Sequence, residues 1–128
     1  MELPEELLYS KTHEWVRNEG GVATVGITDY AQSQLKDIVF VEMPEIGARF
    51  KREESIGVVE SVKTVADLYS PVAGRIVQIN GDLKDHPQYV NEDPYGKGWI
   101  VKIELENKEE LTSLLSAKAY QGTLTEED

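Results

Sequence analysis

The residue with the clearest capacity for chemistry is Lys63, because of where the surrounding sequence places it. Two stretches rich in β-forming residues, 55–62 and 64–70, meet at this lysine. We therefore expect Lys63 at or beside the tip of a β-hairpin, where its amine is solvated. No other basic residue lies within several positions on either side. A single amine on a rigid protrusion is what an enzyme needs in order to modify one site.

Other kinds of reactive site find no support in the sequence. The chain contains no cysteine, which excludes disulfides, thiolate nucleophiles and cysteine-based metal sites. His13 and His86 are the only histidines, and neither has a second imidazole at zinc-pair spacing. Glu92 and Asp93 lack the remaining ligand positions of a calcium loop. Because a nucleophile with its base and a glycine-rich phosphate loop are also missing, we expect no catalytic residues and no metal ligands.

Length and composition predict a single domain of residues 1–128, with a core from about residue 8 to 120 and an acidic tail at 121–128. Of the 128 residues, 40% are hydrophobic, which is enough for a core without metals or cross-links. The chain has 24 acidic and 13 basic residues and a formal net charge of −11. This charge repels phosphate backbones and anionic lipids, so we expect neither nucleic-acid nor membrane partners.

The N-terminal residues 1–8 show neither a basic leader nor an Arg-rich amphipathic pattern, so the sequence predicts no signal or transit peptide. No apolar run reaches the roughly 20 residues that span a bilayer. A cytoplasmic protein of a prokaryote is the simplest interpretation. A mature organellar protein whose transit peptide has been removed would show the same features.

Short β-forming runs separated by turn residues predict an all-β fold of antiparallel strands. In the segment 37–43, Ile38 and Phe40 are expected on one face of a strand and the residues at 39, 41 and 43 on the other. Similar alternation is expected for 74–80. In 99–105, Trp99 is expected to share a buried face with the apolar residues at 101, 103 and 105. The remaining strands are expected at 22–27 and at the two arms of the hairpin.

Two segments are predicted to be helical. Thr28 or Asp29 can cap a short helix that ends at Leu35. Asn107 with Glu110 resembles a capping box that opens a C-terminal helix, whose leucines at 111, 114 and 115 form one stripe against the sheet. The segment 81–97 is expected to be a long ordered loop with room for one helical turn, and the tail 123–128 to be frayed. Both tryptophans, at 15 and 99, are expected to fill the core.

The hairpin sequence 60–63, Glu-Ser-Val-Lys, resembles the lipoyl-attachment hairpin of glycine cleavage H proteins, and the resemblance extends over nearly the whole chain. The chain departs from the family at Lys36, where glycine is usual, and at Met43, where leucine is usual. The first departure adds a side chain and a charge near an expected interaction face, and the second nearly conserves volume. Further blocks with that family's order and spacing are found at 13–16, 26–32, 37–42, 70–74, 90–96 and 98–99.

This resemblance implies a specific fold and a specific modification. The fold is the family's barrel-sandwich hybrid, of the lipoyl/biotinyl-domain kind, with a C-terminal helix. Lipoate would be bound covalently through an amide to Lys63, which places a dithiolane at the end of a flexible swinging arm. Enzymes that attach lipoate would recognise the hairpin around it, at Glu60, Ser61, Val62 and Thr64.

The resemblance also implies a non-catalytic carrier in glycine catabolism with three partner enzymes. In the family, a pyridoxal-phosphate glycine decarboxylase, the P protein, loads an aminomethyl group onto one sulfur. A tetrahydrofolate-dependent aminomethyltransferase, the T protein, takes the carbon and frees ammonia, and dihydrolipoamide dehydrogenase, the L protein, reoxidises the dithiol. Tethering presents the sulfurs at an effective concentration of order millimolar once the proteins have docked.

An S-aminomethyl group can expel its thiol, so the loaded arm needs a cleft in which carboxylates hold the amine protonated and water is excluded. The resemblance implies that Thr12, Glu14 and Asp67 form the polar walls of this cleft.

Three alternatives to this carrier differ in their sequence signals. Biotinyl domains and the lipoyl domains of 2-oxoacid dehydrogenases typically have Met-Lys-Met or Asp-Lys-Ala at the hairpin tip, and this chain has neither. An enzyme would need one of the reactive arrangements that the sequence lacks. A protein that donates its lipoyl group to other proteins would have the same hairpin, so the sequence leaves that alternative open.

Overall fold

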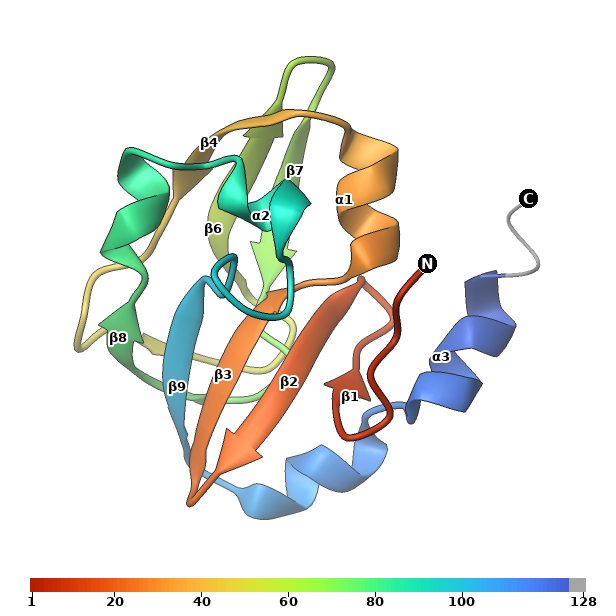
Figure 1. Cartoon of the computed structure of the whole chain (residues 1–128). Helices are drawn as coiled ribbons and strands as arrows, with labels where there is room; N and C mark the ends of the chain where they lie inside the picture. The colour runs from red at the N-terminus through yellow and green to blue at the C-terminus, as the bar shows by residue number, and fades with distance from the viewer. Residues whose placement is uncertain (125–128) are drawn as a thin grey trace.

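Two packed antiparallel β-sheets form the body of the protein, as seen in a computed structural model that describes residues 1–124 (Figure 1). In this part of the chain the larger sheet has six strands, in the order β1-β2-β3-β9-β8-β5, and the smaller has three, in the order β4-β6-β7. The predicted antiparallel all-β fold is confirmed, with two sheets that do not close into a barrel but are compatible with the barrel-sandwich description. The strands are β1 (Leu8–Tyr9), β2 (Glu14–Glu19), β3 (Val22–Ile27), β4 (Ile38–Glu42), β5 (Arg49–Phe50), β6 (Ser55–Ser61), β7 (Val65–Tyr69), β8 (Gly74–Ile79) and β9 (Val101–Leu105).

Short helices connect the strands and cover the ends of the sheets (Figure 1). None of the helices between residues 1 and 124 is long and apolar enough to cross a membrane. The helical segments are α1 (Asp29–Leu35), η1 (Gly81–Lys84), α2 (Tyr89–Glu92), η2 (Lys108–Ser113) and α3 (Ala117–Leu124), of which η1 and η2 are 3₁₀ helices.

Apolar side chains from both sheets fill the space between them. Val25 of β3, Ile76 of β8 and Ile103 of β9 meet Val59 of β6 in one buried cluster. Removing such side chains from water is the main favourable contribution to folding. A second cluster, which includes Trp15, lies on the other side of the larger sheet, where aromatic rings pack beneath α3.

The simple alternation predicted for two strands is wrong, because each strand contains a β-bulge. In β4 the pairing with β6 shifts between Ile38 and Phe40, so that Ile38 and Val41 are buried while Val39 and Phe40 are both exposed. A bulge inserts one extra residue and resets which face the following side chains occupy. In β8 a similar shift lies between residues 76 and 78.

The predicted C-terminal helix begins later than expected. Asn107 does cap a helix, but its side chain accepts from the N–H of Glu109, and the Glu110 carboxylate instead accepts from the N–H of Ala73 at 2.8 Å. The capping box therefore does not form, and the segment is a 3₁₀ helix. The α-helix α3 starts at Ala117 and ends at the buried Leu124, so residues 123 and 124 are helical rather than frayed. The predictions for 125–128 lie outside the described residues.

Two further expectations need correction. The segment 81–97 contains two helices, η1 and α2, rather than a loop with one turn. Trp15 is fully buried as expected, but Trp99 is only half-buried and lies before the start of β9. The ammonium of Lys102 lies 5.3 Å from the centre of the Trp99 ring, so this tryptophan lies at the edge of the core.

The helix α1 begins where the sequence predicts. Thr28 is its N-cap, and the Thr28 hydroxyl accepts a 3.2 Å hydrogen bond from the N–H of Ala31. The chain leaves the helix at Lys36 with φ 69° and ψ −153°, a conformation that essentially only glycine adopts without cost. The carbonyl of Lys36 accepts a 2.9 Å hydrogen bond from the side-chain amide of Asn91, which holds this backbone in place. The strain explains why glycine suits this position.

We expect Lys36→Gly to stabilise the folded protein by about 1 kcal/mol, because relief of backbone strain exceeds the larger chain entropy of glycine. Equilibrium unfolding in urea measures the change. Lys36→Ala is the matched control, since it removes the charged side chain but keeps the Cβ and should leave stability nearly unchanged. Equal stabilisation by both variants would mean that the lysine side chain, and not the backbone, carries the cost.

Candidate functional site

The β6–β7 hairpin projects beyond the rest of the fold and carries Lys63 in its turn (Figure 1). Glu60 of β6 pairs with Val65 of β7, and the backbone N–H of Ser61 donates to the carbonyl of Thr64 at 2.8 Å. The Lys63 side chain is exposed. The predicted position of this lysine at the tip of a hairpin is therefore what the structure shows.

The Ser61 side chain holds the turn in shape from inside. Its hydroxyl is buried and accepts hydrogen bonds from the N–H groups of Lys63 at 3.1 Å and Thr64 at 3.0 Å. The N–H of Val62 donates to the carbonyl of Asp37 at 3.0 Å, which ties the turn to the residue before β4. Such local side-chain bonds favour turns. The arrangement therefore presents one exposed primary amine, a group that can be acylated, on a turn of fixed shape.

A cavity of about 280 Å³ lies between the hairpin and α1, and it brings together Thr12, Glu14 and Asp67, the three residues predicted for a cleft. Glu14 is the first residue of β2, Thr12 lies in the turn before that strand, and Asp67 belongs to β7. The other wall is mostly apolar. It is lined by His13, Ile27, Tyr30, Ala31, Gln34, Leu35, Val59 and Ala66.

Glu14 is the most unusual residue of this cavity, because its carboxyl group is buried. The hydroxyl groups of Ser10 and Thr12 both donate to its Oε1, the former at 2.6 Å, and the N–H of Tyr69 donates to its Oε2 at 3.1 Å. Burial raises the pKa of Glu14 to about 7, against the lowering effect of these donors. The group therefore changes between neutral and negative near neutral pH, and its negative form can pair with a cation that enters the cavity.

The Asp67 carboxylate is exposed, and it accepts hydrogen bonds from hydroxyl groups on its own strand β7 and on the facing strand β6. Its Oδ1 accepts a 3.1 Å hydrogen bond from the hydroxyl of Ser55, and its Oδ2 accepts a 3.4 Å bond from the hydroxyl of Tyr69. The two carboxyl groups that line the cavity thus differ in environment. Asp67 is open to water, whereas Glu14 is not.

A hydroxyl from α3 supports both walls of the cavity. Tyr120 Oη lies 2.7 Å from His13 Nδ1 and 2.7 Å from Thr28 Oγ1. His13 lines the cavity, and Thr28 caps α1, which supplies the apolar wall. Sequence reasoning missed these supporting residues and Ser10, because nothing in the spacing of His13, Thr28 and Tyr120 signals that they meet.

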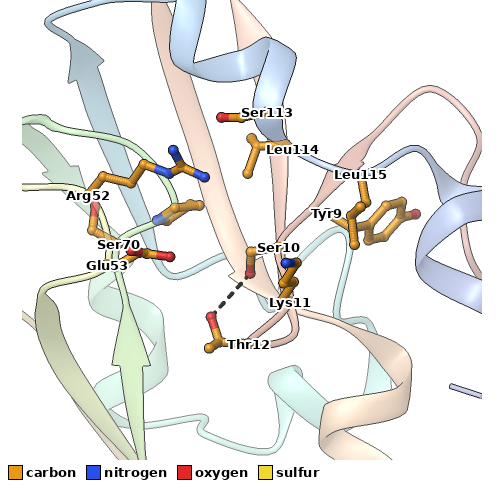
Figure 2. Close-up of a pocket in the computed structure, with 11 residues that line it drawn as sticks. Tyr9, Ser10, Lys11, Thr12, Arg52, Glu53, Ser70, Ser113, Leu114 and Leu115 are labelled. Atoms are coloured by element: carbon orange, nitrogen blue, oxygen red, sulfur yellow. Dashed lines mark hydrogen bonds between the residues drawn. The ribbon is translucent and has the colours of Figure 1, made fainter. Parts of the chain in front are cut away.

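A second, smaller cavity of about 130 Å³ shares Thr12 with the first (Figure 2). Its lining is more polar and includes Lys11, Arg52 and Glu53. Figure 2 marks the hydrogen bond between the Ser10 and Thr12 hydroxyls, whose oxygen atoms lie 3.3 Å apart. The same pair of hydroxyls contacts Glu14, so the two cavities are separated by the groups that hold the buried carboxyl. Within residues 1–124, no group of three or more His, Cys, Asp or Glu could hold a metal ion.

Comparisons with known proteins agree over nearly the full chain. A family model described as glycine cleavage H-protein matches residues 7–127. The chain is 57% identical over 122 residues to the glycine cleavage system H protein of Oceanobacillus iheyensis, covering 95% of this chain and 97% of that protein. It is 55% identical over 120 residues to the one from Symbiobacterium thermophilum, covering 94% of each. The crystal structure of a glycine cleavage system H protein from Mycobacterium marinum matches with a TM-score of 0.87 at 38% identity, covering 95% of this chain and 98% of that one.

Two antiparallel sheets with a projecting, lysine-tipped hairpin define a carrier domain of the barrel-sandwich class. The chain belongs to the glycine cleavage H-protein family. Membership gives it a role in the glycine cleavage system as a component that is not itself an enzyme.

The raised pKa of Glu14 predicts how stability depends on pH. The folded protein holds the Glu14 proton up to a pKa of about 7, whereas the unfolded chain releases it near 4.5. Wild-type stability should therefore fall relative to Glu14→Gln as pH rises from 4.5 through 7, by about 3 kcal/mol in all. Urea unfolding of both proteins at a series of pH values measures the difference. A difference that does not change with pH would show that Glu14 titrates normally.

Proposed function

We propose that Lys63 carries lipoate as an amide and that the protein thereby moves an aminomethyl group between the enzymes of the glycine cleavage system. The group comes from glycine decarboxylase, the P protein, and goes to the tetrahydrofolate-dependent aminomethyltransferase, the T protein. Dihydrolipoamide dehydrogenase, the L protein, completes the cycle. The observation that carries the proposal is the exposed Lys63 amine on a hairpin whose β7 strand also lines the cavity of Glu14.

Bound lipoate would supply a disulfide, one sulfur of which takes up the aminomethyl group as the S–S bond breaks and later releases it. Lys63 fits this group, because its amine is solvated and its turn is held rigid by Ser61. Glu60, Ser61, Val62 and Thr64 form the part of the hairpin that lipoate-attaching enzymes recognise. Glu60 and Val62 are exposed beside the lysine, whereas Ser61 is buried and acts through the shape of the turn.

The cavity residues protect the loaded arm. The negative form of Glu14 pairs with the protonated amine, and Asp67 adds a second carboxylate at the entrance. The Thr12 hydroxyl donates to Glu14 and keeps it oriented. Apolar side chains such as Leu35 and Val59 line the opposite wall and exclude water from the labile bond. Protection therefore depends on the ionised carboxylate and on a dry wall together.

We place this carrier in the cytoplasm. The relatives in Oceanobacillus iheyensis and Symbiobacterium thermophilum are bacterial proteins that match nearly the whole chain. Partners of the cycle would share that compartment.

The attachment site is tested by the peptide-mapped mass of the protein purified from its own host. We expect a lipoyl mass increment that is confined to the peptide containing Lys63. Lys63→Arg keeps the positive charge but offers no amine to acylate, so it should show no increment. An unmodified Lys63 in a host that lipoylates its other proteins would refute the carrier function.

The protective role of Glu14 is tested with the aminomethyl-loaded protein. We expect Glu14→Ala to release ammonia and formaldehyde about tenfold faster than wild type at pH 8, where the wild-type carboxyl is ionised. Glu19→Gln, an exposed acid on the same strand, is the control and should leave the rate unchanged. Equal rates in all three proteins would remove Glu14 from this role.

A further inference from the structure

The smaller of the two cavities carries charges of both signs that do not pair with one another. We call it the side cavity: it measures about 130 Å³, and its charged lining residues are Lys11, Arg52 and Glu53. Figure 2 shows Arg52 and Glu53 on one side of this cavity and Lys11 on the other. Within residues 1–124, none of these three side chains forms an ion pair. Their charges therefore remain available to a ligand.

The hydroxyl groups that line the side cavity already donate their protons elsewhere. Ser10 and Thr12 both donate to the carboxyl group of Glu14. The buried Ser70 hydroxyl donates to the carbonyl of Val72 at 2.6 Å. A hydroxyl group has one proton and two lone pairs, so these oxygens still have the capacity to accept a hydrogen bond. The hydroxyl lining therefore suits a ligand group that donates, such as an ammonium.

The turn that supplies Arg52 and Glu53 is held in a strained shape. Glu53 has a φ of 72°, in the left-handed region that residues with a Cβ seldom adopt. The N–H of Glu53 donates to the carbonyl of Ser70 at 2.7 Å, which ties the turn to the residue after β7. Within the turn, the N–H of Lys51 donates to the carboxylate of Glu54 at 2.8 Å. Strain that the surroundings maintain is frequent at ligand clamps, so it supports a binding role for this turn.

We propose that the side cavity binds a small amino acid in its zwitterionic form. The carboxylate of the ligand pairs with the ammonium of Lys11 and the guanidinium of Arg52. Its ammonium group donates to the Ser70 oxygen and faces the carboxylate of Glu53. The volume is enough for several water molecules, and hence for an amino acid as small as glycine. This inference goes beyond the carrier function and is independent of what Lys63 carries.

Ligands with a single charge fit this lining less well than a zwitterion. A simple anion is repelled by Glu53, which follows Arg52 directly in the same turn, and it has no proton to offer the hydroxyl oxygens. A simple cation is repelled by Lys11 and Arg52 in the same way. An amino acid carries both charges a few bonds apart, so one small molecule satisfies both kinds of lining group.

Titration of the purified protein with glycine, followed by heteronuclear NMR of the backbone amides, tests the side cavity. We expect saturable shifts of amides in the turns at 10–13 and 51–54, with a dissociation constant of order millimolar. Acetate and methylammonium each carry only one of the two charges, so each should bind at least about tenfold more weakly than glycine. Equal affinities for glycine and acetate would reduce the side cavity to an anion site and overturn the proposal.

Single substitutions test which charges hold the ligand. Arg52→Gln and Glu53→Gln should each raise the dissociation constant for glycine about tenfold, because each removes one charged partner of the zwitterion. Glu53→Gln should also reduce the difference between glycine and acetate. Arg49→Gln is the matched control: Arg49 is exposed, does not line the side cavity and lies 3.9 Å from Glu106, so its loss should leave glycine binding unchanged.

Two further comparisons separate this proposal from the carrier function. Protein with unmodified Lys63 and protein with lipoylated Lys63 should bind glycine alike, because Lys63 does not line the side cavity. Amide spectra that are unchanged away from the two turns show that each variant folds normally. Absence of saturable shifts with glycine, or equal affinities of Arg52→Gln, Glu53→Gln and wild type, would overturn the side cavity as a binding site and leave the carrier function intact.

Discussion

The pairing of β6 with β4 on one side and β7 on the other is the constraint on which the functional features depend. Because side chains alternate along a strand, this one strand serves two surfaces. Val59 points into the core and lines the cavity, and Glu60 points outward beside Phe40 and Val65. A slip of one residue in this register would exchange the two faces and expose what should be buried. Ser61 ends the strand and fixes where the turn begins.

The β6–β7 pairing also helps to hold the buried carboxyl of Glu14, because it positions Tyr69. Tyr69, whose N–H donates to Glu14, ends β7, and Thr12 and Ser10 supply the other donors. A buried carboxyl with three donors has its orientation fixed, yet burial still raises its pKa toward neutrality. Such a group responds strongly to any charge that enters the cavity. The fold thus combines a fully solvated amine with a poorly solvated acid, and the two sites need opposite environments.

The sequence predicted the sheets, the hairpin and the lysine because these depend on local patterns. The turn residues of the hairpin and the cap at Thr28 act over a few positions, and both were confirmed. The errors arose where pairing or tertiary contact overrides the local pattern. The bulge in β4 is set by its partner strand, and the Glu110 carboxylate binds Ala73 rather than its own helix end.

In the site, too, some residues could be predicted from the sequence and others could not. Thr12, Glu14 and Asp67 were named from family resemblance, and the structure gathers them around one cavity. The supports of that cavity were not foreseen, because Ser10, His13 and Tyr120 become neighbours only through the fold. Apolar residues on the short helix α1 also form part of the wall, although their spacing predicts nothing beyond ordinary packing.

The contacts of Tyr120 determine when the cavity can be completed during synthesis of the chain. Its hydroxyl joins His13, 107 residues earlier, and Thr28, 92 residues earlier. The hairpin with Lys63 is complete in sequence by residue 69, but the cavity gains its support only when the last helix has emerged from the ribosome. During synthesis the hairpin can therefore form before the cavity is complete. A fusion partner or deletion at the C-terminus acts on the part of the chain that completes the cavity, although it lies far from the hairpin in sequence.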